Sequence, residues 1–284
     1  PQTKGGKMKI GVIPDCFRLP IKQAIKKSAE LKLDGIQPYA TKGDLDPFNM
    51  TKTARDDFKK FVSDLGLEIS AIVGDFGGHG FVDPETLDWR VKRTKEVIDL
   101  AFHLGVKVVT THIGVVPENK STTEWNLLLQ SLPEVGSYAY QKGVFLATET
   151  GPEPTEVLRK LLDELNNPGI MVNYDPANLV MVAGDDPVKG VYTLKNYIVH
   201  THAKDGIKLP DENNKKRWKE LPLGEGNVFQ NDAAEKTVVR GALISTDPPY
   251  YSSITYADFA DFFYGTFRKA LKSIFSDLFI TLTT

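Results

Sequence analysis

The stretch Ile170-Met171-Val172-Asn173-Tyr174-Asp175-Pro176-Ala177-Asn178 decides the fold. It begins with a short apolar run, 170–172, which is typical of a buried strand. The chain then reaches the acid Asp175. An acid placed where a buried strand ends faces the rim of a sheet or barrel, where α/β proteins build their sites. The stretch therefore predicts an α/β protein with a site at the carboxyl ends of its strands.

Three other predicted strands end in a residue of the same kind. They are the strand at 144–148, which ends at Glu149, the strand at 107–111, which ends at His112, and the strand at 197–199, which runs into His200 and His202. Carboxylates and imidazoles together form a ligand set that suits a divalent metal such as Mn, Mg, Co or Zn. Their common position at strand ends predicts one metal site.

Strands and amphipathic helices alternate along the chain. The predicted strands are 8–14, 35–39, 67–73, 107–111, 144–148, a strand leading into Asp175, and 196–201, and the predicted helices are 21–33, 51–65, 89–104, 122–142, 154–165 and 187–194. Near-continuous apolar strands between helices indicate a parallel sheet covered on both faces. Seven or eight such units favour a closed (β/α)8 TIM barrel over an open sheet. No G-x-G-x-x-G follows the first strand, which disfavours a dinucleotide-binding fold.

Composition narrows the class of protein. The chain has 284 residues and a net charge of -2, so no global basic field points to nucleic acid. The single cysteine, Cys16, excludes an intrachain disulfide, and we expect a cytoplasmic protein. No apolar run reaches about 18 residues, so no transmembrane helix is expected. Residues 1–7 are interpreted as a disordered lead-in or tag scar, and 8–284 as a single domain.

Residues 8 to about 228 resemble the sugar phosphate isomerase/epimerase family, the xylose isomerase-like TIM barrels. The motifs that carry the resemblance are Thr111-His112-Ile113-Gly114, Glu149-Thr150-Gly151, the stretch 173–178, His200-Thr201-His202-Ala203-Lys204-Asp205 and Leu223-Gly224-Glu225-Gly226-Asn227-Val228. Their order and spacing together are more specific than any one motif. The resemblance implies a metal-dependent sugar or sugar phosphate isomerase or epimerase.

The resemblance also implies a ligand set. Members of the family bind one divalent metal through a Glu, an Asp, a His and a second Glu from the last strand. In this sequence Glu149, Asp175 and His202 match the first three. The related endonuclease IV barrels hold three zinc ions, and Asn178 stands where those barrels have a histidine. We therefore expect one metal and no abasic-site repair.

The chemistry assigns further roles. Moving a proton next to a sugar carbonyl passes through an enediolate, and a carboxylate base can remove that proton. We expect Glu149 to bind metal and act as the base, His112 to hydrogen-bond a substrate oxygen, and Lys204 to stabilise the oxyanion. We also expect contacts to the substrate from Gln37, Asn178 and Glu225. The sequence leaves open whether the chain forms a homo-oligomer.

Structural interpretations compete with these roles. Glu149 could be a solvated strand-end acid, Asp175 could merely begin a turn before Pro176, and His112 could be a rim residue without a ligand role. We expect His200 and His202 to point to opposite sides of their strand. On that expectation His200 faces the helices and has a structural role.

The end of the chain departs from the family pattern. No Thr-Ile-Glu ending follows 223–228, and residues 241–246 lead instead to Asp247-Pro248-Pro249-Tyr250. Residues 232 to 282 resemble a fragment of an adenine-specific DNA methylase, in which this motif holds a flipped base. We expect 229–284 to supply an atypical last barrel unit, with 241–246 as the eighth strand. Asp247 then becomes the candidate fourth ligand and second acid/base.

Two further hypotheses about function remain open. The chain could be a barrel that binds a sugar-like ligand, or is inactive, because it lacks the last ligand Glu. A weaker hypothesis is a nucleic-acid-related role through the methylase-like tail, against which the net charge counts. The fourth metal ligand discriminates between the enzyme and the binding protein.

Overall fold

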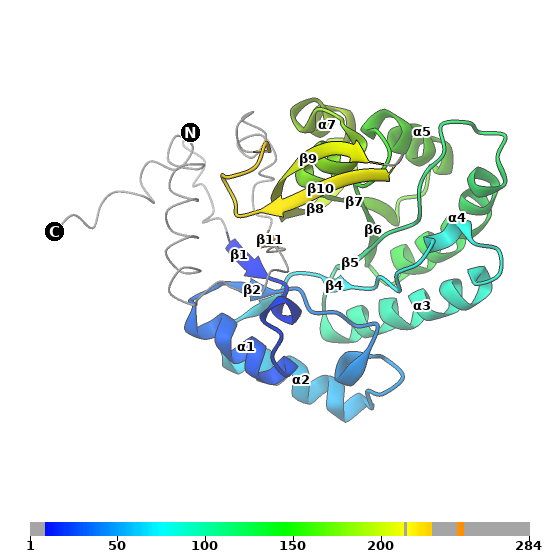
Figure 1. The fold of residues 1–284 in the computed structure, drawn as a ribbon. Coiled ribbons are helices and arrows are strands. Elements are labelled where there is room, and N and C mark those ends of the chain that lie inside the picture. The colour runs from blue at the N-terminus through cyan, green and yellow to red at the C-terminus, as the bar shows by residue number, and fades with distance from the viewer. Residues whose placement is uncertain (1–8, 213–214, 229–242, 247–284) are drawn as a thin grey trace, which may run out of the picture.

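A parallel sheet curls into a barrel, and helices surround it on the outside (Figure 1). The computed structural model describes residues 9–212, 215–228 and 243–246. Within the described part of the chain, helical crossovers join successive parallel strands from β1 to β8, which is the arrangement of a (β/α)8 TIM barrel. The predicted fold class is confirmed.

Nine short strands form the sheet in the order β3-β2-β1-β11-β8-β7-β6-β5-β4, and every neighbouring pair is parallel. The strands are β1 (Lys9–Val12), β2 (Gly35–Ile36), β3 (Glu68–Ile69), β4 (Ile72–Val73), β5 (Val108–Thr111), β6 (Phe145–Glu149), β7 (Ile170–Tyr174), β8 (Ile198–Ala203) and β11 (Leu243–Thr246). Neighbours in the barrel are mostly neighbours in sequence, as short crossovers require.

The two ends of this order meet, which closes the barrel. β3 and β4 are two pieces of one extended run, separated only by Ser70 and Ala71. β3 pairs with β2 on one side and β4 pairs with β5 on the other. A bridge from Tyr39 to Val73 continues the seam beyond β2. The run 67–73 was expected as one unbroken strand, but it changes its pairing partner midway. Because β3 and β4 together occupy one position in the barrel, the nine strands fill eight strand positions.

The helices cover the outside of the sheet. They are α1 (Ile21–Glu30), α2 (Lys52–Asp64), α3 (Leu87–Leu104), α4 (Thr123–Gln141), α5 (Thr155–Leu165) and α7 (Pro187–Leu194), whereas the single turn α6 (Pro176–Asn178) follows β7 beside the cavity described below. The hydroxyl of Thr51 accepts a hydrogen bond from the Ala54 amide and so begins α2. Gly105 ends α3 in the left-handed conformation. These boundaries follow the signals in the sequence.

The main core lies between the sheet and the helices. Side chains on the outer face of the strands, such as Val109, Leu146 and Tyr174, pack with apolar helix residues into one large cluster. The inner face of the barrel is different, because its upper part is lined by buried polar side chains. Burying polar groups costs free energy unless they are hydrogen-bonded, so this inner layer is the first place to look for function.

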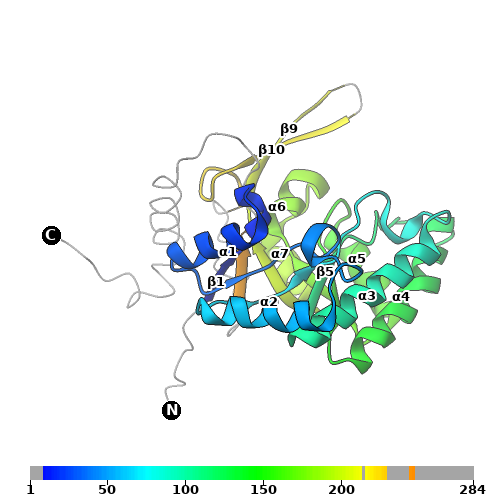
Figure 2. The same ribbon diagram turned by 90° about the horizontal axis from the view of Figure 1, so that it is seen from below.

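A β-hairpin follows β8 and was not predicted. It consists of β9 (Asp205–Glu212) and β10 (Lys215–Leu221), which pair antiparallel and project away from the barrel (Figure 2). Among the described residues, no helix is long and apolar enough to cross a membrane.

The eighth strand position of the barrel is filled by the atypical end of the chain. β11 lies between β1 and β8, within the run 241–246 in which we expected the eighth strand. Asp247 and the methylase-like motif lie outside the described residues. The remaining domain boundaries stay predictions.

Candidate metal centre

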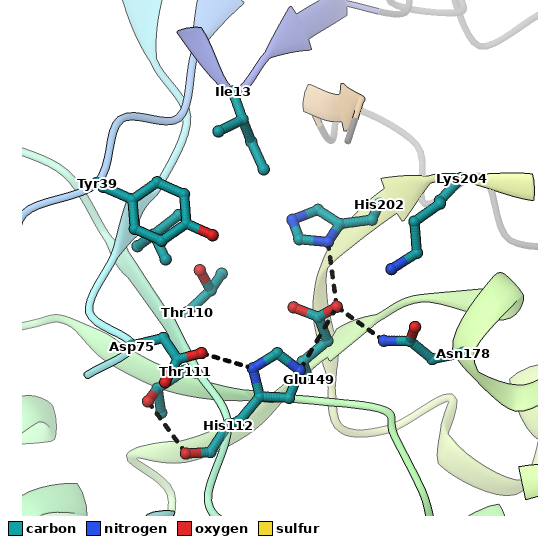
Figure 3. Close-up of a pocket in the computed structure, with 11 residues that line it drawn as sticks. Ile13, Tyr39, Asp75, Thr110, Thr111, His112, Glu149, Asn178, His202 and Lys204 are labelled. Carbon is teal, nitrogen blue, oxygen red and sulfur yellow. Dashed lines mark hydrogen bonds and ion pairs between the residues drawn. The ribbon is translucent and has the colours of Figure 1, made fainter. Parts of the chain in front are cut away.

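An open cavity of about 160 Å³ lies at the carboxyl ends of the strands. Its walls come from loops and strand ends all around the barrel, and they include Ile13, Tyr39, Asp75, His112, Glu149, Asn178, His202 and Lys204 (Figure 3). Active sites of TIM barrels form at this end because loops from all eight strands converge there.

Glu149, Asp175 and His202 converge beside the cavity. One ligand atom from each lies within 4.8 Å of the others. His202 Nδ1 is 3.5 Å from Glu149 Oε1 and 3.9 Å from Asp175 Oδ2. The expected convergence of these three side chains is therefore present in the structure.

Asp175 is held by the backbone of the short helix α6. Its Oδ1 accepts hydrogen bonds from the amides of Ala177 and Asn178, which leaves Oδ2 facing the other two side chains. The ammonium of Lys204 is 2.8 Å from Oδ2, yet Oδ2 accepts no hydrogen bond of good geometry among the described residues. Burial raises the pKa of Asp175, and the charge of Lys204 only partly offsets that effect.

Glu149 lies at the centre of the constellation (Figure 3). Its Oε1 accepts a hydrogen bond from Asn178 at 2.9 Å, and His112 Nε2 lies 3.9 Å from the same oxygen. Burial raises the pKa of this carboxyl, but the charges of His202 and His112 outweigh burial, so the pKa lies well below its usual range. Glu149 is therefore ionised and is not a solvated acid.

His112 bridges the cavity between two acids. Its Nδ1 is 2.8 Å from Asp75 Oδ2, and its side chain is 47% exposed at the mouth. Burial of part of the ring lowers its pKa, but Glu149 and Asp75 outweigh this and raise the pKa of His112 to about 9. A protonated imidazole at neutral pH can donate a hydrogen bond toward the cavity.

His202 presents one nitrogen to the acids and the other to the barrel wall. Its Nε2 is 3.1 Å from Gln37 Oε1, and the Gln37 amide in turn donates to Thr110 Oγ1 at 2.9 Å. Because an amide oxygen only accepts, this contact favours a proton on Nε2, and Nδ1 is the nitrogen that faces the two acids. Gln37 is fully buried and does not line the cavity, so it lies behind His202.

These residues fit a divalent ion. Two carboxylates and one imidazole are donors that Mn, Mg, Co and Zn accept. Asp175 Oδ2 is a buried oxygen without a hydrogen bond among the described residues, and His202 turns its Nδ1 toward both acids. Lys204 supplies positive charge beside Asp175 Oδ2 in the metal-free protein, and a bound metal ion would add charge at the point where the three ligand atoms converge.

The expectation for His200 was wrong. The rings of His200 and His202 lie 5.7 Å apart in a T-shaped arrangement, so both point into the barrel. Residues two apart on a strand share a face, which the expectation overlooked. Burial lowers the pKa of His200 to about 3, so its ring is neutral.

The other predicted site residues divide into three groups. Asn178 lines the cavity and holds Glu149, and Lys204 lines it as well. Glu225 is exposed in the turn after β10 and does not line the cavity. Asp247 lies outside the described residues.

Two acids were missed by reasoning from the sequence. Asp75 lies in a loop rich in glycine, where no strand-end rule draws attention to it. Asp205 is buried, and its carboxylate accepts hydrogen bonds from the amides of Gly206, Gly224, Gly226 and Val228. It therefore fixes the loop 223–228, and the repeated glycines of that loop are the signal that could have revealed it.

Comparisons with known proteins agree with this architecture. The sequence model of the family described as Xylose isomerase-like TIM barrel matches residues 25–242. A xylose isomerase domain protein from Planctomyces limnophilus superposes with a TM-score of 0.78 at 24% identity, covering 94% of this chain and 99% of that one. Comparison with curated proteins finds no match.

Two other solved structures share the fold. A D-tagatose 3-epimerase-like protein has a TM-score of 0.73 at 19% identity and covers 95% of this chain and 100% of that one. A xylose isomerase-like TIM barrel protein from Mycobacterium smegmatis, in complex with magnesium, has a TM-score of 0.64 at 19% identity and covers 89% of this chain and 93% of that one. At these identities the likeness is one of fold.

Proposed function

Because the chain belongs to the xylose isomerase-like TIM barrel family, we propose that it is a metal-dependent isomerase or epimerase of a sugar or sugar phosphate. Its reaction is proton transfer next to a carbonyl, through an enediolate. The likeness to a D-tagatose 3-epimerase-like protein supports a sugar as the substrate.

The observation that carries the proposal is the cluster of Glu149, Asp175 and His202 within 4.8 Å at the edge of an open cavity. A bound divalent ion would polarise the substrate carbonyl as a Lewis acid. The fold family and the magnesium complex of the Mycobacterium smegmatis protein support this cofactor. Mn, Mg, Co and Zn all suit the ligand set.

Glu149 is the proposed base. Its Oε1 faces His202, Asn178 and His112 (Figure 3), and its other oxygen accepts a hydrogen bond from Asn173. That second oxygen takes the proton from the carbon next to the substrate carbonyl. The depressed pKa of Glu149 keeps it ionised, which is the form that a base must have before it accepts a proton.

His112 and Lys204 are proposed to act on substrate oxygens. Protonated His112 donates a hydrogen bond from Nε2 to an oxygen of the substrate, and Asp75 keeps the ring in place through Nδ1. Lys204 carries its positive charge to the cavity wall, where it favours a developing oxyanion. Asn178 is proposed to contact the substrate as well as Glu149.

The second acid/base is proposed to be Asp247, which follows β11 directly in the sequence. Aspartate is one methylene shorter than glutamate, so its reach falls by roughly 1.5 Å. Misplacement of that order costs about a hundredfold in rate. We therefore expect slow turnover, which Asp247→Glu should increase.

The test measures exchange of substrate protons with solvent. Purified protein is loaded with Mn²⁺, Mg²⁺ or Co²⁺ and incubated with a panel of ketoses and ketose phosphates in D2O, and NMR follows loss of the proton next to the carbonyl. Exchange should occur with at least one substrate, need metal, and disappear in Glu149→Gln. Glu156→Gln on α5, an exposed glutamate that does not line the cavity, is the matched control and should keep full exchange.

The outcomes separate the alternatives. Metal binding without exchange for any ketose would favour a sugar-binding or inactive barrel. Exchange that survives Asp247→Ala unchanged would show that another group returns the proton.

A further inference from the structure

Glu149, Asn173 and His200 form a row across three adjacent strands. Glu149 on β6 is the register partner of Asn173 on β7, and Asn173 is the partner of His200 on β8. The register shifts between Val172 and Asn173, because Val172 pairs with Ile198 and Val199 is the extra residue. Such bulges re-aim side chains, and this one brings His200 level with Asn173.

The side chains of this row are joined by hydrogen bonds. His200 Nδ1 is 2.8 Å from Asn173 Oδ1, and Asn173 Nδ2 donates to Glu149 Oε2 at 3.3 Å. His200 and Asn173 are buried, 3% and 0% exposed, and the side chain of Glu149 is 9% exposed. The oxygen of Glu149 that Asn173 contacts is the one not engaged by His202, Asn178 and His112.

Asn173 Nδ2 also lies 3.3 Å and 3.4 Å from the two nitrogens of the His202 ring. A hydrogen bond in the plane of the ring would single out one nitrogen. Nearly equal distances to both place the amide beside the ring as a whole, so we take Glu149 Oε2 as its acceptor.

Only one arrangement of protons satisfies the row. With the proton of His200 on Nδ1, the ring donates to Asn173 Oδ1, and the Asn173 amide then points at Glu149. With the opposite tautomer and a flipped amide, Asn173 Oδ1 would face the carboxylate oxygen, and a donor on His200 Nε2 would be buried. His200 Nε2 has no partner among the described residues, so a proton there would be unsatisfied.

We propose that Asn173 and His200 are a positioning pair for Glu149, in which His200 fixes the amide of Asn173 and the amide fixes the carboxylate. A carboxylate held at Oε2 keeps Oε1 directed at His202 and Asp175, where the metal ligands converge. The part of this inference that concerns metal affinity rests on the proposed function, whereas the hydrogen-bonded row does not.

The first test reads the tautomer of His200 in the metal-free wild-type protein. NMR of 15N-histidine distinguishes a protonated ring nitrogen from a bare one, and His200→Asn, which places an amide where Nδ1 was, identifies the signal by its loss. We expect the proton on Nδ1. A proton on Nε2 overturns the pairing, whether or not the protein has any activity.

The second test compares Mn²⁺ affinity by electron paramagnetic resonance after removal of bound metal. His200→Leu removes the donor and should weaken Mn²⁺ binding about tenfold or more. His200→Asn restores a donor and should bind close to wild type. His103→Leu, which removes an imidazole paired with Asp56 outside the site, should leave the affinity unchanged.

The two readouts fail separately. Wild-type affinity in His200→Leu, or equal weakening in both His200 variants, overturns the positioning role. If the wild type binds no Mn²⁺, the proposed metal site has failed, and the tautomer alone decides the hydrogen-bonded row. If His200→Leu does not fold, the wild-type tautomer and the affinity of His200→Asn still decide whether the pairing stands.

Discussion

Lys204→Met should lower the free energy of unfolding of the metal-free protein and yet raise the affinity of the protein for Mn²⁺. The Lys204 ammonium lies 2.8 Å from Asp175 Oδ2, and the two side chains are 6% and 0% exposed. At an effective dielectric constant of about 20, two unit charges at that distance attract by about 6 kcal/mol. Removing one partner of such a buried pair costs about 3–5 kcal/mol in folding free energy, because the other charge stays buried.

The lower end of that range is the better expectation for this pair. Asp175 already has a raised pKa, so in the variant it can take up a proton and escape part of the penalty. We therefore expect urea unfolding of the metal-free variant to show a loss of about 3 kcal/mol. Lys142→Met is a matched control, because Lys142 also pairs with an acid, Asp99, but on the surface. It should cost much less than Lys204→Met, because solvent screens a surface pair.

A divalent ion beside Asp175 would supply the charge that Lys204 supplies in the metal-free protein. The stability gap between variant and wild type should therefore narrow as Mn²⁺ is added. By linkage, each 1.4 kcal/mol of narrowing is about a tenfold gain in Mn²⁺ affinity, and complete closure of the gap is roughly a hundredfold gain. Isothermal titration calorimetry measures this directly. Mn²⁺ affinity equal to or weaker than wild type, together with the loss of stability, would refute the reasoning.

Three further predictions concern other parts of the site. The pKa of His112 is raised from 6.5 to about 9 in the folded protein, so its contribution to stability is fully present below pH 6.5 and is lost as pH rises through about 9; urea unfolding of wild type and His112→Asn should differ most at low pH and converge above 9. Asp205→Ala should release the loop 223–228, seen as faster hydrogen exchange of the four amides that Asp205 binds, while amides of the α5 helix stay protected. Gly226→Ala should loosen the same loop, because its Cβ would lie 2.2 Å from Asp205 Oδ1, whereas Gly143→Ala, where nothing lies within 4 Å of a Cβ, should change only the local backbone strain; the same exchange measurement compares the two.

Much of the barrel could be predicted from the sequence because its signals are local. Apolar runs indicated the strands, helical spacing indicated the helices, and Thr51 and Gly105 marked helix ends through their own hydrogen bonds and backbone angles. The hairpin β9–β10 was missed because its residues are mostly exposed, so neither strand carries an apolar run. The division of the run 67–73 into β3 and β4 depends on which neighbouring strand each half pairs with. No pattern within 67–73 encodes that pairing.

The site was predictable to the level of the strand end but not of the side chain. The rule that ligands follow buried strands placed Glu149, Asp175 and His202 at one rim, and they converge there. The direction of the His200 side chain follows from strand periodicity. The prediction placed residues two apart on opposite faces of the strand, whereas they share one face. The contact between His200 and Asn173 depends in addition on a bulge, because one extra residue, Val199, changes which residues lie level across β7 and β8.

Charge balance explains why these side chains can lie close together. Glu149, Asp175 and Asp75 bring three acids to one end of the barrel, and mutual repulsion alone would oppose their burial. Lys204, which follows β8, pairs with Asp175. His112, which follows β5, lies between Asp75 and Glu149. The two cations therefore act at different places. Lys204 lies beside Asp175 Oδ2, whereas His112 lies at the mouth of the cavity. A metal ion therefore competes with Lys204 and leaves His112 in place. Substitution of Lys204 should for that reason change metal affinity much more than substitution of His112.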